Sequence, residues 1–539
     1  MANSEKTFKS YDQHQTLLFP TNLSSMIDQY HPVRFVSDII DNLDLSLLIT
    51  DYSSNGASAY HPKMMLKVWI YAYLNNIYST RKLETFLKEN IHGMWLSGMQ
   101  TPDHNTLSRF RSGKLKPHIK KVFFKIVKFL IDQDQLDLTV AYTDGTKIES
   151  VANKYTFVWA KKVKNAQINI SKALEKIWDY AEELSTDEFK NKRPDSLVPI
   201  SGDHMLDLLT DIEEELKDKE VSKEIQRKIT YAKTTQAPKI DQYKKQEEIL
   251  DGRNSYSKTD HDATFMKMKD DPMKNGQLKP SYNTQVSTEN EYAINYSIHQ
   301  TAGDSTTFKE HHDEIKEELG KHTEIAVADS GYGSEENYNY LEKNDIENLV
   351  KYAGLHSELR TRKKEAFKFT PNSFYINEEL NFAVCPMGQK MEFIGIKEQK
   401  STTGFKQEIH RYAARNCKNC PLQPRCFKSK YKDKNKVLSI NLKVIRYRKK
   451  AKENLTSKEG EELRKRRCAE VEQFFGQMKG NKKFKRFLMK GIDKVSIELG
   501  LLFISMNIQK YVRKKLAEAK SALFYESEAL IYSNYGCVA

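Results

Sequence analysis

The clearest hydrophobic pattern in the chain is an alternation with a period of two in two short segments, each of which ends in an aspartate. The first segment carries, on one parity, Leu136, Leu138, Val140, Tyr142 and Asp144. The second carries Ile325, Val327 and Asp329. A period of two is typical of β-strands with one buried face. We therefore predict that Asp144 and Asp329 lie at the carboxyl ends of two buried strands, where ligand sites of open α/β sheets gather.

A third segment has the period of an amphipathic helix. Its apolar positions follow i, i+3, i+4, i+7 spacing and are Val471, Phe474, Phe475 and Met478. Glu472 and Lys479 lie seven residues apart beside this stripe, so they share one helix face. Glu470, with Arg466 four residues before it, is the competing carboxylate. Glu472 is preferred because Lys479 lies on its own face.

Residues 1 to about 130 have helical periodicity and little strand signal. An apolar stripe follows Pro62 and comprises Met64, Met65, Val68, Trp69, Ala72 and Tyr73. A second helix is predicted from Ser79, and Asp103 or Asn105 would cap a short helix farther on. That helix presents three basic side chains, Arg109, Arg111 and Lys114. The segment is either a helix-turn-helix-like DNA-binding domain or a helical support domain with surface ion pairs.

The remaining periodicity divides the chain into a discontinuous core and two insertions. The core covers 136–162, 256–354 and 441–515, with further strands at TFVW and from Tyr282 to Gln300. Residues 163–255 form a helical insertion of alternating charge, 355–440 a cysteine-containing insertion, and 516–539 a tail. Asp304 is interpreted as a helix cap. Asp260, Asp262, His311 and His312 are interpreted as structural polar residues.

Charge and hydropathy change the picture in one respect. The 539 residues carry a net charge of +14 and a pI near 9.1, and the basic residues crowd around Glu472 between Arg446 and Lys490. Such a segment favours a DNA phosphate backbone as its partner. The expected DNA contacts there are Arg467, Lys482, Lys483, Lys485 and Arg486. No amino-terminal signal is present and the most apolar run is short, so we expect a cytoplasmic protein without membrane contact.

Four cysteines in the second insertion could act together. Cys385, Cys417, Cys420 and Cys426 occur in CPMG and CKNCPLQPRC. Four thiolates satisfy a tetrahedral zinc ion, which would let a small domain fold without a large core. The spacing is not that of a standard double knuckle, so structural zinc and free thiols stay open as alternatives. Cys468 and Cys537 are interpreted as ordinary thiols.

Five strings of the chain resemble those of DDE transposases from bacterial insertion sequences. They are TDGTKIESVANKYTFVW, SKTDHDATFMKMKDD, KPSYNTQ, ADSGYGSEENY and VEQFFGQMKGNKKFKRFLMKG, and the likeness also includes WLSGMQTPDHNTLSRFRSGK. The resemblance covers roughly residues 15 to 510. It implies an α/β, RNase H-like core with a mixed sheet and flanking helices. It also implies two-metal-ion catalysis, in which Asp144, Asp329 and Glu472 bind two Mg²⁺ or Mn²⁺ ions with Lys479 beside them.

The chain departs from the family pattern before the glutamate. Many relatives have Tyr-x2-Arg-x3-Glu-x6-Lys, whereas Lys465 and Cys468 occupy the first two positions here and Arg467 is one residue away. The resemblance implies a transposase that binds the double-stranded ends of its element, cleaves them and joins the 3′ ends to target DNA, as a homodimer or larger assembly. A metal-dependent nuclease without strand transfer and a non-catalytic DNA-binding derivative are the rival interpretations.

Overall fold

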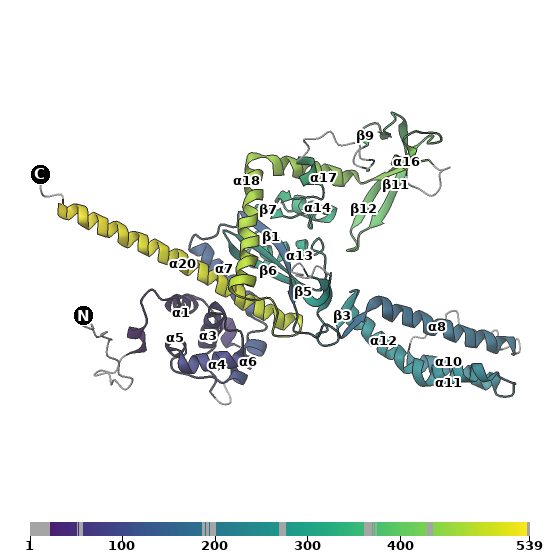
Figure 1. The fold of residues 1–539 in the computed structure, drawn as a ribbon, viewed down its shortest axis with the longest axis horizontal. Helices are drawn as coiled ribbons and strands as arrows, with labels where there is room; N and C mark the ends of the chain where they lie inside the picture. The colour runs from purple at the N-terminus through teal and green to yellow at the C-terminus, as the bar shows by residue number, and fades with distance from the viewer. Residues whose placement is uncertain are drawn as a thin grey trace, which may run out of the picture. The chain divides into compact units, whose positions relative to one another are not determined.

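The computed structural model of the protein divides into two compact units (Figure 1). It describes residues 22–50, 52, 58–185, 189, 193, 201–268, 276–359, 369, 371, 374–427 and 435–535. One unit contains the described residues up to Ile126 together with those from Ile497 onward, and the other spans Val127–Ser496. The predicted core segment 441–515 therefore belongs to two units, and most of the predicted tail, 516–539, continues a helix.

The first unit is helical, as its sequence pattern predicted. Its elements are η1 (Leu23–Met26), α1 (Pro32–Asn42), α2 (Ser46–Ile49), α3 (Pro62–Leu74), α4 (Thr80–Glu89), α5 (Ile91–Leu96), α6 (His104–Arg109), the π-helical η2 (Phe110–Lys114), the start of α7 (Ile119–Asp132) and most of α20 (Ile492–Tyr535). Trp69 and Tyr73 of α3 are buried. Ser79 and Asp103 occupy the N-cap positions of α4 and α6, and the Asp103 carboxylate accepts from the N–H of Thr106 at 2.7 Å.

The second unit contains a six-stranded mixed sheet. Its strands are β1 (Val140–Glu149), β4 (Thr264–Lys267), β5 (Leu278–Glu289), β6 (Tyr292–His299), β7 (Ile325–Ala328) and β8 (Glu347–Val350). The order is β4-β5-β1-β7-β8, and β6 also pairs with β5. β1, β7 and β8 run parallel, whereas β5 is antiparallel to β1 and β6. This arrangement agrees with the RNase H-like fold class expected from the sequence.

The helices of this core contact the sheet or one another. They are α13 (Phe308–Leu319), α14 (Glu335–Lys343), α17 (Leu442–Thr456), α18 (Lys458–Arg467), the π-turn η5 (Cys468–Glu472), α19 (Gln473–Gly476) and the π-turn η6 (Gln477–Asn481). α13 meets one face of the sheet, where Thr143 Oγ1 lies 3.1 Å from Nε2 of His312. η5 contacts β1 and β5. Since neighbouring strand residues point to opposite faces, Asp144 points away from α13.

The predicted helical insertion has a core of its own. A two-stranded ribbon of β2 (Phe157–Trp159) and β3 (Ser255–Ser257) precedes and follows it. Between them lie α8 (Ala160–Glu183), α10 (Gly202–Leu216), α11 (Lys223–Tyr231), the π-turn η3 (Ala232–Gln236) and α12 (Ala237–Leu250), shown together in Figure 1. Trp178 of α8 is buried among apolar residues of these helices. The insertion is thus a helical bundle.

The cysteine-containing insertion forms a separate five-stranded sheet. Its elements are α15 (Leu355–Leu359), β9 (Tyr375–Asn377), β10 (Phe382–Val384), β11 (Lys390–Lys400), β12 (Lys406–Ala414), α16 (Gln423–Cys426) and β13 (Val437–Ile440). The strand order is β13-β12-β11-β10-β9, all antiparallel. In the described part of the chain, no helix combines the length and apolarity needed to cross a membrane.

Candidate active site

Asp144 and Asp329 lie side by side on neighbouring strands. Thr143 of β1 is paired with Ala328 of β7 in parallel register, so the next residue of each strand is an aspartate. Asp329 directly follows β7, as predicted. Asp144 does not end its strand, because β1 continues to Glu149 and pairs with β5 over that length. The expected strand end is therefore wrong for Asp144, although the strand register places the two aspartates next to each other.

An arginine links the third carboxylate, Glu472, to Asp144. Nη2 of Arg467 lies 2.9 Å from Oδ2 of Asp144, and its Nη1 lies 3.7 Å from Oε1 of Glu472. Arg467 and Asp144 are buried, whereas 59% of the Glu472 side chain is exposed. A single guanidinium thus joins two of the three predicted carboxylates. Arg467 was expected to contact DNA, but here its charge is directed into the carboxylate cluster.

A π-turn accounts for the unusual spacing before Glu472. The N–H of Gln473 donates to the carbonyl of Cys468, five residues back, which is the bond that defines η5. A π-turn accommodates one more residue than an α-turn. Arg467, five residues before Glu472, therefore contacts the glutamate where family spacing would place the residue four before it. The π-turn thus accommodates the one-residue difference between this sequence and the family spacing.

The neighbouring glutamate has a different environment. Glu470 is buried, and its Oε2 accepts from the N–H of Glu291 at 2.5 Å. Its Oε1 accepts from Nε of Arg466 at 3.0 Å. These contacts tie the helix to the β5–β6 turn. Glu472, unlike Glu470, lies close to the arginine that pairs with Asp144.

A fourth acid approaches the site from the α13 side of the sheet. Oδ1 of Asp304 accepts from Nδ2 of Asn283 at 2.8 Å and from Nε2 of Gln285 at 3.1 Å. Its side chain therefore is not the predicted helix cap; its backbone carbonyl instead accepts from the N–H of Thr307. A Cβ at Gly145 would lie 3.0 Å from Oδ1 of Asp304. The glycine after Asp144 thus leaves room for this acid, which the sequence reasoning missed.

Two further residues respond to the local charge. Burial raises the pKa of the Tyr332 hydroxyl, and Asp304, Asp144 and Asp329 raise it further. That hydroxyl donates to Oε1 of Gln285, which links it to the Asp304 network. Burial, followed by the nearby guanidinium of Arg467, lowers the pKa of Lys351, which directly follows β8. Tyr332 lies in the string ADSGYGSEENY but was given no role there, and Lys351 lies outside every string that the sequence analysis quoted.

The basic residues beyond Glu472 fall into two groups. Lys483 and Lys485 are exposed, and Lys479 is half-buried. Lys482 is buried. Nε of Arg486 donates to the carbonyl of Ser150 at 3.0 Å, so this arginine holds the segment after β1. The exposed lysines are presented to solvent as a DNA-binding role requires.

The three basic residues predicted for the amino-terminal helix also separate. Arg111 is buried, its guanidinium lies 4.3 Å from the centre of the Trp69 ring, and it donates to the carbonyl of Tyr78 at 3.0 Å. Arg111 is therefore not presented to solvent as expected. Arg109 and Lys114 are exposed and line one pocket of about 610 Å³.

The four residues interpreted as structural lie within hydrogen-bond networks of the core. Asp260 accepts from Ser150 Oγ at 2.6 Å, and Asp262 accepts from the N–H of Ile492 at 2.9 Å. His311 and His312 contact serine and threonine hydroxyls of the sheet. Each has a local partner and lies apart from the Arg467 contacts.

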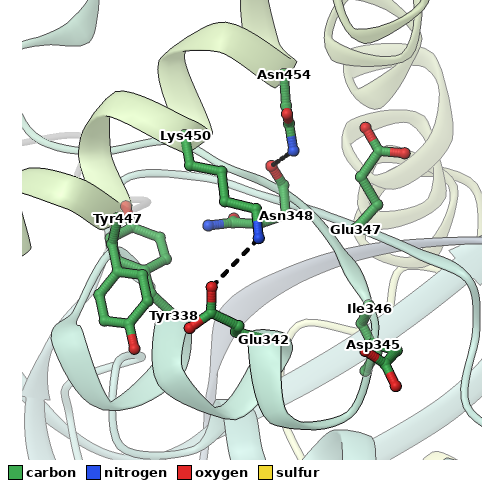
Figure 2. Close-up of a pocket in the computed structure, with 9 residues that line it drawn as sticks. All are labelled: Tyr338, Glu342, Asp345, Ile346, Glu347, Asn348, Tyr447, Lys450 and Asn454. Carbon is green, nitrogen blue, oxygen red and sulfur yellow. Dashed lines mark hydrogen bonds and ion pairs between the residues drawn. The ribbon is translucent and has the colours of Figure 1, made fainter.

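A well-formed cavity lies away from the carboxylates. Figure 2 shows it between α17 and the α14–β8 segment, with a volume of about 280 Å³. Lys450 of α17 pairs with Glu342 of α14 at 3.2 Å, and Nδ2 of Asn454 donates to the carbonyl of Asn348. These contacts dock α17 onto the core. They fix α17, which precedes the helical segment that carries Glu472. None of the predicted site residues lines the cavity.

The acids at the site offer oxygen ligands, which hard divalent cations prefer. Their net negative charge is offset by Arg467. Among the described residues, no three His, Cys, Asp or Glu side chains are gathered closely enough to hold a metal ion. The donor type fits Mg²⁺ or Mn²⁺.

Two protein-family models match the chain. The model of a transposase domain, DUF772, matches residues 21–113, and the model of a transposase DDE domain matches residues 384–512, which include Glu472 and Lys479. These two matches support a DDE transposase. Searches of curated proteins and of solved structures each gave no significant match. The two matched families imply DNA as the substrate.

Proposed function

We propose that this transposase cleaves the ends of its element and joins the 3′ ends to target DNA, using Asp144, Asp329 and Glu472 to hold Mg²⁺ or Mn²⁺. The proposal rests on two contacts of the Arg467 guanidinium. It lies close to both Asp144 and Glu472, which are far apart in the sequence. The register of β1 and β7 adds Asp329 beside Asp144. Two aspartates on neighbouring strands and a glutamate on the adjoining helical segment are the kind of ligand set that metal-assisted phosphodiester chemistry uses.

The bound ions would activate the attacking water or hydroxyl and stabilise the leaving oxygen. Hydrogen bonds within the chain hold the aspartate carboxylates in place. Asp144 is fixed within a paired strand, and its Oδ1 accepts from the N–H of Gly145 at 2.7 Å. Oδ1 of Asp329 accepts from the N–H of Gly331 at 2.8 Å. Glu472, which is exposed, has the freedom to adjust when substrate binds.

Basic side chains would hold the DNA against these carboxylates. Lys479 follows Glu472 by two turns and would place a point charge near the scissile phosphate. Lys483 and Lys485 are exposed farther along the chain and would contact the backbone. Once the guanidinium of Arg467 leaves the carboxylates, it can turn to a phosphate oxygen. Joining two ends requires a homodimer or larger assembly on DNA.

A product assay tests the proposal. The full chain is incubated with Mg²⁺, duplex DNA carrying the sequences that flank its coding region, and a labelled target. Strand-joined products together with cleaved 3′-hydroxyl ends are expected. Cleaved ends without joining would indicate a nuclease, and specific binding without cleavage would indicate a non-catalytic derivative. Asp329→Asn is the matched inactive variant, so any product that it still forms comes from a contaminant.

A further inference from the structure

The four cysteines of the second insertion converge although they come from three separate segments. Cys385 follows β10, Cys417 and Cys420 lie in the turn after β12, and Cys426 ends α16. All four line one cavity of about 220 Å³. All four are half-buried, and none forms a disulfide. The sheet and α16 therefore bring together thiols that are up to about forty residues apart in the printed sequence.

The backbone around these thiols is shaped by tight turns. The carbonyl of Cys385 accepts from the N–H of Gly388 at 2.8 Å, and Gly388 has a φ of +79°. On the opposite side, the N–H of Cys420 donates to the carbonyl of Cys417 at 3.4 Å. Each turn leaves its cysteine at the cavity wall. Two turns that face one cavity, each with a thiol at its start, form a frame for a four-ligand site.

The chemistry of the lining selects for a soft metal. Lys436 is the only charged residue among the described residues that line the cavity. Its N–H donates to Sγ of Cys417 at 3.3 Å, and its Nζ donates to the carbonyl of Cys426 at 3.2 Å. A thiolate-only set favours zinc over Mg²⁺ or Ca²⁺, which prefer oxygen. Lys436 would offset part of the negative charge of four thiolates.

The five-stranded sheet has a small apolar core. Its buried apolar residues are Phe374, Ala383, Met391, Tyr412, Ala414, Leu438, Ile440 and Leu442. Ile394 and Ile396 on β11 are exposed by about half, so much of the long β11–β12 hairpin contributes little to the core. A core of this size gives modest stability, and natural small domains often add a structural metal.

We propose that Cys385, Cys417, Cys420 and Cys426 bind one structural zinc ion, separate from the carboxylate site. The four thiols line one cavity but are farther apart than the ligands of a bound metal ion. On binding zinc, they would move a small distance toward the ion. The zinc would fix the sheet from which β13 leads into α17. Nε2 of Gln407 on β12 also donates to Glu335 of α14 at 2.9 Å, so the sheet is attached to the core.

Metal analysis of the full chain, purified without added metal, tests this site. About one zinc per chain is expected, and the Cys417→Ser, Cys420→Ser double variant should lose it. Cys468→Ser is the matched control, because Cys468 is an exposed thiol outside the cavity, and it should keep the zinc. Replacement by Co²⁺ should give the absorption spectrum of tetrahedral thiolate coordination in the wild-type chain, even if the double variant fails to fold.

Zinc removal should also have a local structural effect. A strong chelator should raise hydrogen exchange in residues 375–440, while the β1–β5 pairing stays protected. Absence of zinc together with four reactive thiols in the folded protein would overturn the proposal. Bound iron with an iron–sulfur spectrum would also overturn it. These results are independent of strand joining, so they do not depend on the proposed function.

Discussion

Nη2 of Arg467 lies 2.9 Å from Oδ2 of Asp144, and both side chains are at least 90% buried. The guanidinium also approaches Glu472, so it supplies positive charge where a divalent cation would otherwise compensate the carboxylates. A charge pair of this kind is costly to break from one side, since the remaining charge stays buried without compensation. Arg467 and the metal are therefore expected to alternate at these acids.

The first prediction concerns that exchange. Arg467→Gln should lower the free energy of unfolding by about 3 kcal/mol in the absence of divalent metal, as for the loss of one partner of a buried pair. Mg²⁺ should then stabilise the variant more than the wild type, because it no longer competes with the guanidinium. Urea unfolding with and without Mg²⁺ measures both effects.

Arg466→Gln is the matched control. Arg466 is the preceding residue, is half-exposed and pairs with Glu470 rather than with the aspartates. Its loss should also lower stability, because it leaves the buried carboxylate of Glu470 without its cation, but it should bring no added response to Mg²⁺. Equal Mg²⁺ responses of the two variants would contradict the exchange between Arg467 and the metal.

Much of the site was predictable from the sequence, and the failures have physical causes. Periodicity identified the strands of Asp144 and Asp329, but it could not show that β5 extends β1 beyond the aspartate, because strand pairing is a non-local property. The Arg467 contact depends on a π-turn, for which the sequence gives no reliable signal. Asp304 lies in a cap-like segment, and only the folded sheet brings Asn283 to it.

A second prediction follows from the position of Asp304. Asp304→Asn should weaken Mg²⁺ binding and cleavage by about 10- to 100-fold, as do substitutions in the shell around metal ligands. The reason is that Asp304 adds negative charge and fixes Asn283 and Gln285 beside the site. Asp345→Asn, at an exposed position in the cavity of Figure 2, should leave both unchanged. Calorimetric Mg²⁺ titration is the measurement, and an unchanged affinity in Asp304→Asn would remove its role.

A third prediction assigns DNA contacts in the amino-terminal unit. Arg109→Ala with Lys114→Ala should weaken binding to the element's ends and reduce the slope of log affinity against log salt by about 2, since each phosphate contact contributes about 0.9. Removal of two exposed charges from the helical insertion, Lys244→Ala with Lys245→Ala, is the control and should have little effect. Gel-shift titration at several salt concentrations measures both the affinity and the slope. Equal losses of affinity in the two double variants would indicate a general charge effect.

The fourth prediction is a pH dependence of stability. Burial raises the pKa of Glu289 to about 7, although the N–H groups of Leu138 and Val140 donate to its carboxylate. Between about pH 4.5 and pH 7 the folded state therefore holds a proton that the unfolded state has released. By linkage, this group's contribution makes the free energy of unfolding fall as pH rises through that range.

Glu289→Gln should remove this contribution. The difference between the wild-type and variant free energies of unfolding, measured by urea at each pH, isolates Glu289 from other titrating groups such as the buried His312. Burial lowers the pKa of His312 to about 3, which favours folding at higher pH and is present in both proteins. A difference that does not vary between pH 4.5 and pH 7 would show that Glu289 titrates normally.

We propose that Glu472, and not Glu470, completes the catalytic carboxylates. Cleavage of element-end DNA by Glu472→Gln and Glu470→Gln, with Mg²⁺ and at a temperature where both are folded, tests it most directly. Because changes around metal ligands already cost about 10- to 100-fold, loss of the ligand Glu472 should reduce cleavage more than 100-fold while leaving DNA binding intact. Glu470→Gln should retain cleavage and lose stability. An active Glu472→Gln beside an inactive, folded Glu470→Gln would contradict the account.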